Sequence, residues 1–297
     1  MTANRKATIG VIGTGDMGSA VGGALVRSGY RVVTAGEGRG ALSQRLAAAA
    51  GIEDVGSLAA VVRAAELVLS IVPPAAALGV AADTARALVA SGARPVFVDC
   101  NAVAPATVLD VERTLAPAGA PFADCGIVGR APGLDGERTR FFVSGPARAA
   151  LLGLDVEQIE LIDLGEEVGT ASAMKMAYSA LNKGTDALLT TVLLAAERLG
   201  VRGPLMRELE GSQAQALARM RARVPFLGAT AKRFAPEMAE IAKTYESVGV
   251  TPQFHRGAEW LYALVARTPL AAETRATQPK SRTLDEALAV YVAALDG

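Results

Sequence analysis

The feature that most constrains this chain is a glycine-rich segment near its start, residues 8–18, which reads TIGVIGTGDMG. Gly13, Gly15 and Gly18 follow an apolar run in the spacing G-x-G-x-x-G. In a strand–turn–helix unit the first glycine permits a tight turn, the second lets a diphosphate approach the backbone, and the third lets the helix pack against the strand. The free N–H groups at the start of that helix attract an anion. The segment therefore predicts a dinucleotide site, and a glycine-rich turn without a ligand is the alternative.

The residues around this turn complete a βαβ unit of about 30 residues, which is the usual size. Residues 17–26 are compatible with a helix, Gly29 is placed to end it, and residues 30–34 form a second β-rich run. The predicted cofactor contacts in the turn are its glycines and the residues between them: Gly13, Thr14, Gly15, Asp16, Met17 and Gly18.

The loop after the second strand, residues 35–40, bears on the choice between NAD and NADP. An acidic side chain there binds the ribose hydroxyls of NAD, whereas an arginine accommodates the 2′-phosphate of NADP. The loop contains both kinds of side chain, Glu37 and Arg39. Arg39, and the lack of an acid directly at the strand end, favour NADP as the cofactor, and NAD stays open.

The rest of the first half alternates short apolar runs with helical patterns. The predicted strands are residues 67–72, 96–99, 122–127, 141–144 and 159–164. Near-continuous apolar strands separated by helices predict a mostly parallel, doubly wound sheet with helices on both faces. Ligands of such sheets bind at the carboxyl ends of the strands. This rule adds three predicted cofactor contacts: Val72, Pro73 and Asn101.

The sequence changes character at Gly165, after which only helical patterns follow. The predicted helices are residues 170–199, residues 205–222, residues 232–247, a helix opened by Thr251-Pro252, and a last helix that begins with a capping box of Thr283 and Glu286. We therefore predict an α/β Rossmann domain at residues 1–164 and an all-α substrate and dimerisation domain at residues 165–297.

Lys175 is the candidate for acid–base chemistry. It lies near the start of the long predicted helix, and Tyr178 and Ser179 follow one turn later, so the three side chains share a face. A lysine that is partly desolvated beside a nicotinamide ring can donate a proton to a carbonyl that is being reduced. A solvated helix lysine is the alternative.

The segment around Lys175 resembles a motif of the β-hydroxyacid dehydrogenase superfamily, which includes 6-phosphogluconate and 3-hydroxyisobutyrate dehydrogenases. In that family a G-x-G segment precedes the catalytic lysine, and Gly169 and Lys175 reproduce the outer spacing. Ala171 replaces the middle glycine, and Ser179 replaces an asparagine of the family. Residues 231–242 are similar to a lesser-known branch, whose members are named only as phosphogluconate dehydrogenase-like proteins. The similarity to this branch spans nearly the full chain.

The resemblance implies an N-terminal Rossmann domain, an all-helical C-terminal domain and a nicotinamide-dependent oxidoreductase with Lys175 as its acid and base. Residues 99–105 resemble the strand-end segment where the family places a serine or asparagine beside the nicotinamide and substrate, which here is Asn101. In the branch a Gly-Arg pair ends the loop after the second strand, and Gly38-Arg39 matches that pair.

Residues 124–130 resemble the substrate loop of the family, D-A-P-V-S-G-G. The serine of that motif is Val128 here, and its last glycine is Arg130. Arg130 can grip a carboxylate or phosphate through two hydrogen bonds, and a surface arginine is the alternative. His255 is a candidate substrate contact in the second half of the chain, and a packed structural histidine is the alternative. The predicted substrate contacts are Gly126, Val128, Arg130, Tyr178, Ser179 and His255.

Composition argues against several other classes of function. Lysine plus arginine and aspartate plus glutamate number 30 each, so we expect no basic surface for nucleic acid or an anionic membrane. No apolar run approaches the ~18 residues that a membrane span needs. The two cysteines, Cys100 and Cys125, and the single histidine argue against a disulfide scaffold and a histidine metal site. We expect a soluble, cytoplasmic protein without a metal.

Three functions remain open. The main hypothesis is an NAD(P)-dependent oxidoreductase that transfers a hydride between the nicotinamide and a small carbonyl or hydroxyacid-like compound, with Lys175 handling the proton. The alternatives are an NADPH-dependent imine reductase and a non-catalytic NADP(H)-binding sensor.

Assembly is predicted from the long helix at residues 170–199. It carries a high density of apolar residues: Leu181, Leu188, Leu189, Val192, Leu193 and Ala196. That density, together with the pairing of these domains in the resembled family, predicts a two-fold homodimer.

Overall fold

The computed structural model describes residues 6–133, 136–275 and 277–296. The chain forms two compact units, Met1–Met176 and Ala177–Gly297. The first unit combines a sheet with helices, and the described part of the second contains helices alone. A mostly parallel sheet covered by helices and followed by a helical region confirms the predicted fold class.

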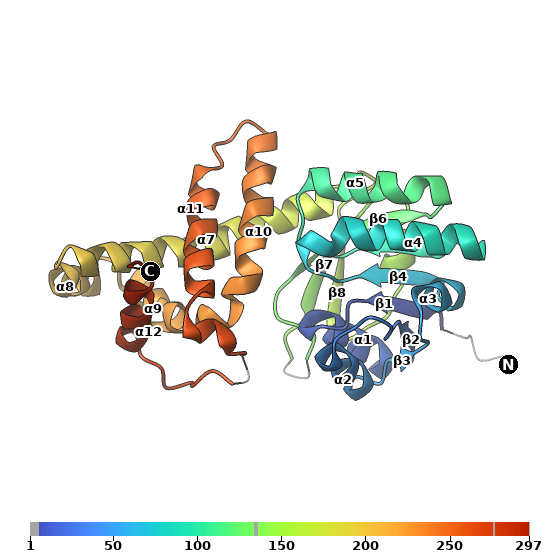
Figure 1. Cartoon of the computed structure of the whole chain (residues 1–297). Helices are drawn as coiled ribbons and strands as arrows, with labels where there is room; N and C mark the ends of the chain where they lie inside the picture. Colours follow the sequence, from blue (N-terminus) through green and yellow to red (C-terminus); the bar gives the residue numbers. More distant parts are fainter. Residues whose placement is uncertain (1–5, 134–135, 276, 297) are drawn as a thin grey trace. The chain divides into compact units, whose positions relative to one another are not determined.

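The first unit is built on an eight-stranded sheet with the order β3-β2-β1-β4-β5-β6-β7-β8 (Figure 1). The strands are β1 (Thr8–Ile12), β2 (Arg31–Thr34), β3 (Glu53–Asp54), β4 (Leu67–Ser70), β5 (Val96–Asp99), β6 (Phe122–Val128), β7 (Thr139–Ser144) and β8 (Ile159–Asp163). Neighbouring strands are parallel except for β6 and β7, which are antiparallel. Because β1, β4, β5 and β6 run in the same direction, their carboxyl ends meet at one edge of the sheet.

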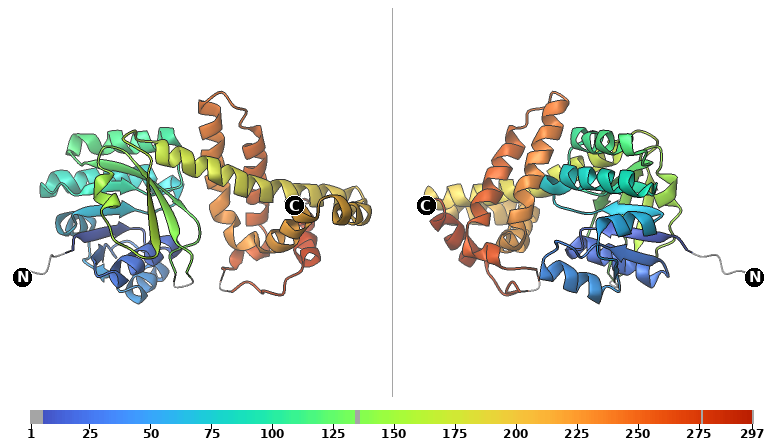
Figure 2. Two further views of the ribbon diagram at one scale, coloured as in Figure 1. Left: turned by 180° about the vertical axis from the view of Figure 1, so that it is seen from behind. Right: turned by 45° about the vertical axis from the view of Figure 1, so that its right-hand side comes forward.

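Helices cover both faces of this sheet (Figures 1 and 2). They are α1 (Asp16–Arg27), α2 (Ala41–Ala49), α3 (Leu58–Ala64), α4 (Ala77–Ser91), α5 (Pro105–Leu115) and α6 (Ala149–Leu152), with short 3-10 turns η1 (Pro74–Ala76) and η2 (Ala116–Ala118). Helices α1, α2 and α6 share one apolar core with Ile9 and Leu69, whereas α3, α4 and α5 share a second core with Val68 and Phe97. Strand β4 is buried along its whole length because both of its faces are covered.

The second unit is helical throughout its described residues. Its elements are most of α7 (Thr170–Arg198), α8 (Arg202–Ser212), α9 (Ala214–Arg223), η3 (Val224–Phe226), α10 (Gly228–Ser247), α11 (Gln253–Ala266), η4 (Pro269–Ala272) and α12 (Leu284–Ala293). Helices α10 and α11 lie side by side (Figure 2). The rings of Phe234 and Tyr262 meet edge to face at 5.3 Å between centroids. A buried ion pair joins α7 to α10, with 2.6 Å between Lys183 Nζ and Glu237 Oε2.

The single helix predicted at residues 205–222 is wrong. The chain forms α8 and α9 instead, and Gln213 between them has φ −140° and ψ 46°. Gly211 and Ser212 end α8, and both residue types favour non-helical backbone. The two-residue strand β3 and the short helix α6 were not predicted, because elements of this length carry almost no periodic signal.

The division between the two units falls within α7, after Met176. The first turn of α7 is hydrogen-bonded to β6 and β7 and therefore groups with the sheet.

In the described residues no helix is both long and apolar enough to cross a membrane. The same residues contain no group of three His, Cys, Asp or Glu side chains that could hold a metal ion.

Candidate cofactor site and active site

The turn between β1 and α1 has the geometry that a dinucleotide needs. Gly13 has φ +93°, and a Cβ at this position would lie 2.4 Å from the Ile71 carbonyl oxygen. A Cβ on Gly18 would lie 1.9 Å from the Gly13 carbonyl oxygen. A Cβ on Gly15, in contrast, would meet none of the described atoms within 4 Å. Packing of the protein itself therefore requires Gly13 and Gly18, whereas Gly15 borders open space that a diphosphate would fit.

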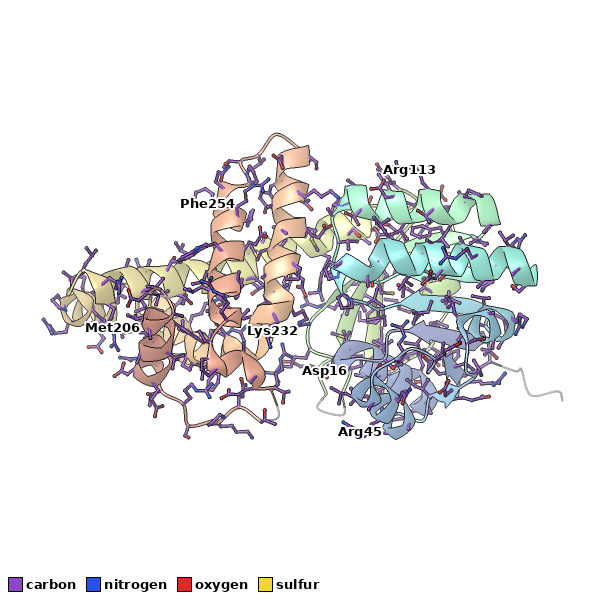
Figure 3. All side chains as sticks on the ribbon, in the orientation of Figure 1. Asp16, Arg45, Arg113, Met206, Lys232 and Phe254 are labelled. Atoms are coloured by element: carbon purple, nitrogen blue, oxygen red, sulfur yellow. The ribbon has the colours of Figure 1, made fainter. Side chains whose placement is uncertain are left out.

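The start of α1 offers backbone donors for that diphosphate. Gly15 is the N-cap residue and has no side chain to bond the first N–H groups of the helix. These groups, with the partial positive charge of the helix end, suit an anion. Asp16 and Met17 begin the helix, and Asp16 is exposed (Figure 3). Thr14 is buried, and its Oγ1 lies 2.8 Å from Ser43 Oγ, which ties the turn to α2.

A cavity of about 150 Å³ adjoins this turn, and Arg39, Gln44 and Asp54 line it. Asp54 Oδ1 accepts the N–H groups of Gly36 and Gly56, each at 2.8 Å, and so holds the loop after β2. Arg39 supplies a cation and Asp54 a hydrogen-bond acceptor. These residues fit the ribose of a dinucleotide, with or without a 2′-phosphate.

Sequence reasoning missed Gln44 and Asp54 in this cavity. Asp54 ends β3, which is only two residues long (Glu53–Asp54) and lacks the apolar run that marks a strand. One signal could have found Asp54: it is an acidic residue that follows the first two strands, and dinucleotide-binding folds place an acid for the ribose after the first βαβ unit.

Asn101 is 3% exposed, and its amide group is bonded inside the protein. Its Oδ1 accepts the N–H of Val72 at 2.7 Å. Its Nδ2 donates to Asp99 Oδ2 at 2.7 Å and to Ser70 Oγ at 3.2 Å. The asparagine thus holds the turn after β4, in which Val72 is buried and Pro73 is exposed.

Two buried carboxyl groups stand on adjacent strands at this edge. Asp99 and Asp124 are partners in the register of β5 and β6. Burial raises the pKa of Asp99 to about 7, and the nearby Asp124 adds to the increase, while bonds from Asn101 oppose it. Burial also raises the pKa of Asp124, against the effect of bonds from Ser172 and Gly169.

Lys175 lies at the carboxyl end of β6. Its Nζ donates to the Ile127 carbonyl oxygen, and its side chain is half-buried. A Cβ on Gly126 would lie 2.5 Å from the Ala171 carbonyl oxygen and 2.9 Å from Lys175 Cβ, so glycine is what lets α7 pack this closely on β6. The structure therefore places together Gly126 and Lys175, which were predicted from two separate motifs.

Other residues of the same loop differ in their access to a ligand. Val128 is 1% exposed and packs with Phe142 and Ala171, so its side chain does not reach the surface. Arg130 is exposed, and its carbonyl oxygen accepts the Thr139 hydroxyl at 2.7 Å. Of these two predicted substrate contacts, only Arg130 has a side chain that a ligand can reach.

The remaining predicted substrate contacts belong to the second unit. On α7, Tyr178 is 37% exposed and Ser179 is buried. His255 on α11 is buried, and its ring centroid lies 4.3 Å from that of Tyr245. Burial lowers the pKa of His255 and so favours the uncharged ring. Its Nδ1 has no hydrogen-bond partner among the described residues.

Two protein-family models match the chain. Residues 8–152 match the NAD binding domain of 6-phosphogluconate dehydrogenase, and residues 196–265 match a domain of unknown function, DUF1932. The second match includes residues 231–242, which carry the resemblance to the lesser-known branch. No curated protein matches the chain.

Solved structures with the same architecture span nearly the whole chain. A conserved hypothetical protein from Sinorhizobium meliloti is 27% identical with a TM-score of 0.64, and the match covers 97% of this chain and 96% of that one. A 3-hydroxyisobutyrate dehydrogenase from Salmonella typhimurium is 15% identical with a TM-score of 0.68, covering 96% and 100%. A reductive aminase from Aspergillus terreus, in complex with NADPH, cyclohexanone and allyl amine, is 16% identical with a TM-score of 0.53, covering 98% of each chain. The last two matches show the fold alone.

The geometry and the family matches point to one class of cofactor. The open space at Gly15 and the cavity at Arg39 fit a dinucleotide, and the match over residues 8–152 is to the NAD-binding domain of a dehydrogenase. The chain belongs to the β-hydroxyacid dehydrogenase superfamily and is an NAD(P)-dependent dehydrogenase or reductase of that type.

Proposed function

We propose that the protein transfers a hydride between NADP(H) and a small carbonyl or hydroxyacid-like compound, and that Lys175 gives and takes the proton. The place of Lys175 in the first unit carries this proposal. Its ammonium bonds the Ile127 carbonyl at the end of β6. Strand β6 is parallel, through β5 and β4, to β1, whose carboxyl end leads into the glycine turn. The lysine and the cofactor turn therefore occupy the same edge of the sheet.

The proton is the part of the reaction that Lys175 handles. A bound nicotinamide supplies or accepts the hydride. During reduction the Lys175 ammonium donates a proton to the carbonyl oxygen, and during oxidation the neutral amine accepts a proton from the hydroxyl. The Ile127 carbonyl restricts the ammonium to one position and so presents the proton at the sheet edge.

NADP is the proposed cofactor because Arg39 lines the cavity beside the glycine turn. A guanidinium binds a phosphate through two charge-assisted hydrogen bonds. Asp54 lines the same cavity, but its Oδ1 already accepts two backbone N–H groups. That use favours a structural role for Asp54 over binding of the ribose hydroxyls of NAD.

The proposed substrate contacts in the first unit are Gly126 and Val128, through their backbones, and Arg130, through its side chain. Tyr178, Ser179 and His255 are proposed as substrate contacts on the family resemblance alone. Arg130 suits a carboxylate or phosphate group of the substrate. Val128 takes the place of the family's serine with a buried apolar side chain, which supports a substrate other than the usual hydroxyacids.

Reduction of an imine is the second candidate function. The reductive aminase that shares this fold was solved with a ketone and an amine. Val128 and Ser179 replace the serine and the asparagine of the resembled motifs, and this change supports a carbon–nitrogen substrate as an alternative.

We also infer a cytoplasmic homodimer. Helix α7 leaves Leu181 and Leu188 70% and 60% exposed, and Leu199, the residue after its last one, is 74% exposed. Leu193 and Ala196 of the same helix are buried within the unit. Exposed leucines along and just beyond one helix are typical of a surface that a partner covers, and a second copy of this chain is the proposed partner.

Purified protein tests the reaction directly. NADPH or NADH is mixed with a panel of aldehydes, keto acids and cyclic imines, and loss of the reduced cofactor is followed by absorbance. Turnover of a carbonyl compound with NADPH supports the main proposal, and turnover of imines alone supports the second candidate. Binding of NADPH without turnover of any compound would favour the non-catalytic sensor.

A further inference from the structure

Asp124 is a fully buried carboxylate in an otherwise apolar strand. Strand β6 (Phe122–Val128) reads FADCGIV, and all of its residues are buried. Asp124 Oδ2 accepts the N–H groups of Gly169 and Ser172 at 3.0 and 2.9 Å. Its Oδ1 accepts the Ser172 hydroxyl at 2.7 Å. A buried carboxylate is costly unless it is hydrogen-bonded, so these bonds explain how the strand tolerates it.

These bonds take the place of a local N-cap for α7. The first N–H groups of a helix have no partner within it and are usually bonded by a side chain just before the helix. The residue before α7 is Gly169, which has no side chain. Asp124 accepts the N–H of Ser172 instead, and the Ser144 hydroxyl on β7 accepts that of Ala171 at 3.1 Å. The carboxylate also lies at the positive end of a helix of 29 residues.

The same contacts fix the rotation of α7 against β6. Ser172 precedes Lys175 by about one turn, so both side chains leave the same side of the helix. Ser172 bonds Asp124, and Lys175 bonds the Ile127 carbonyl three residues further along the strand. Between these points Gly126 lies under the Ala171 backbone, where a Cβ would not fit. A rotation of α7 that broke the bonds to Asp124 would carry Lys175 with it.

We propose that Asp124 is a positioning residue: it caps α7 from β6 and thereby sets the place of the Lys175 ammonium. Asp124 acts through the helix and not through contact with a substrate. The consequence for turnover rests on the proposed function of Lys175, whereas the position of the ammonium can be tested without any substrate.

Carbon-13 methylation of lysines gives a direct readout of that position. The chain contains only six lysines, so the NMR signals are few, and the variant Lys175→Arg identifies the signal of Lys175. Asp124→Ala removes the capping oxygens, and Asp124→Asn keeps an acceptor of the same shape. Thr283→Ala is the matched control, because Thr283 Oγ1 also accepts the third N–H of a helix, that of Glu286 in α12, at 3.2 Å.

We expect Asp124→Ala to move the Lys175 signal. Amide exchange of residues 169–176 should become about 10–100-fold faster, since hydrogen bonds to a charged group are lost. Asp124→Asn should return both measurements toward those of the unchanged protein. Thr283→Ala should speed exchange at the start of α12 and leave the Lys175 signal in place.

An unchanged Lys175 signal in Asp124→Ala would overturn the proposal, and so would an equal movement in Thr283→Ala. If Asp124→Ala does not fold, Ser172→Ala replaces it, because this variant loses only the hydroxyl bond to Oδ1. A movement of the Lys175 signal in Ser172→Ala then supports the proposal, and an unmoved signal overturns it.

Turnover separates this proposal from the function on which its consequence rests. With any substrate that is turned over, Asp124→Ala should lower kcat by about 10–100-fold, as expected for a displaced catalytic group, and leave NADPH affinity unchanged. If Lys175→Ala keeps full turnover, the proposed function fails, while the Lys175 signal still decides the role of Asp124.

Discussion

The N–H of Val72 lies 2.7 Å from Oδ1 of Asn101, so the asparagine at the end of β5 holds the turn that follows β4. The rule that strand-end residues face the ligand predicted Asn101 as a cofactor contact, and the family resemblance implied a place beside the nicotinamide. Its amide is bonded to Val72, Asp99 and Ser70. We infer that Asn101 serves the cofactor site by shaping the turn at Val72 and Pro73.

Asn101→Ala should therefore affect stability and cofactor binding together. The free energy of unfolding should fall by about 1–3 kcal/mol, because the buried N–H of Val72 loses its acceptor. NADPH should also bind more weakly, as measured by fluorescence titration. Tyr30→Phe is the control, because it removes the bond from the Asp155 N–H, 2.9 Å long, at the amino edge of the sheet. Unchanged NADPH affinity in Asn101→Ala would separate Asn101 from the cofactor site.

Asp99 should make stability depend on pH. In the unfolded chain its carboxyl group loses its proton near its ordinary pKa of 3.8, whereas burial in the folded protein raises this pKa to about 7. Between these values the folded state binds the extra proton, so the free energy of unfolding should fall as pH rises. Below pH 3.8 and above about pH 7, Asp99 no longer makes the free energy of unfolding depend on pH.

Urea titrations of the unchanged protein and Asp99→Asn at about pH 5 and about pH 8 measure this effect. The unchanged protein should lose more stability between the two pH values than the variant does. Some fall should persist in the variant, because burial also raises the pKa of Asp124. Equal losses in the two proteins would show that Asp99 does not titrate in this range.

Arg39→Ala should weaken NADPH far more than NADH. Loss of a charge-assisted phosphate contact should cost NADPH about 10–100-fold in affinity, with little change for NADH. Arg45→Ala is the matched control, since Arg45 lies exposed on the neighbouring helix α2 (Figure 3) and does not line the cavity. Isothermal titration with each cofactor gives the comparison. An equal loss for both cofactors would remove Arg39 from the phosphate site.

Lys175→Ala should lower turnover by about 10²–10⁴-fold if its role is proton transfer. NADPH affinity should stay nearly intact. Lys175→Arg should remain impaired, because a guanidinium keeps the charge but does not release its proton. Lys280→Ala, which removes an exposed lysine of the second unit, is the control. Wild-type turnover in Lys175→Ala would refute the assignment, and recovery in Lys175→Arg would indicate a purely electrostatic role.

Leu188→Glu should disrupt the homodimer. Leu188 is 60% exposed on α7, and burying a carboxylate there against a second copy is unfavourable. Sedimentation at low micromolar concentration should show a dimer for the unchanged chain and a smaller species for the variant. Leu78→Glu, at a leucine 44% exposed on α4, should leave the dimer intact. A single species near the chain mass of 30.4 kDa in the unchanged protein would contradict the dimer itself.

The parts of the fold that sequence reasoning predicted are those with a local signal. Residues 8–18 predicted a strand, a turn and a helix, and the structure has β1 and α1 there. Thr283 and Glu286 predicted a capping box, and both of its hydrogen bonds are present. Strand β3 (Glu53–Asp54) was missed because two polar residues carry no periodic pattern.

The sequence by itself determined most of the strands and helices and the glycine turn, because these follow from neighbouring residues and their backbone preferences. Only the tertiary structure decided what each polar side chain does. Asp124 and Ser172 are 48 residues apart in sequence, and Asn101 and Val72 are 29 apart. Such pairs form because burial removes water and each polar group must then bond whatever the packing brings beside it. Tertiary packing also decided the surroundings of Val128. This residue was predicted to touch substrate, and its side chain is buried among apolar side chains.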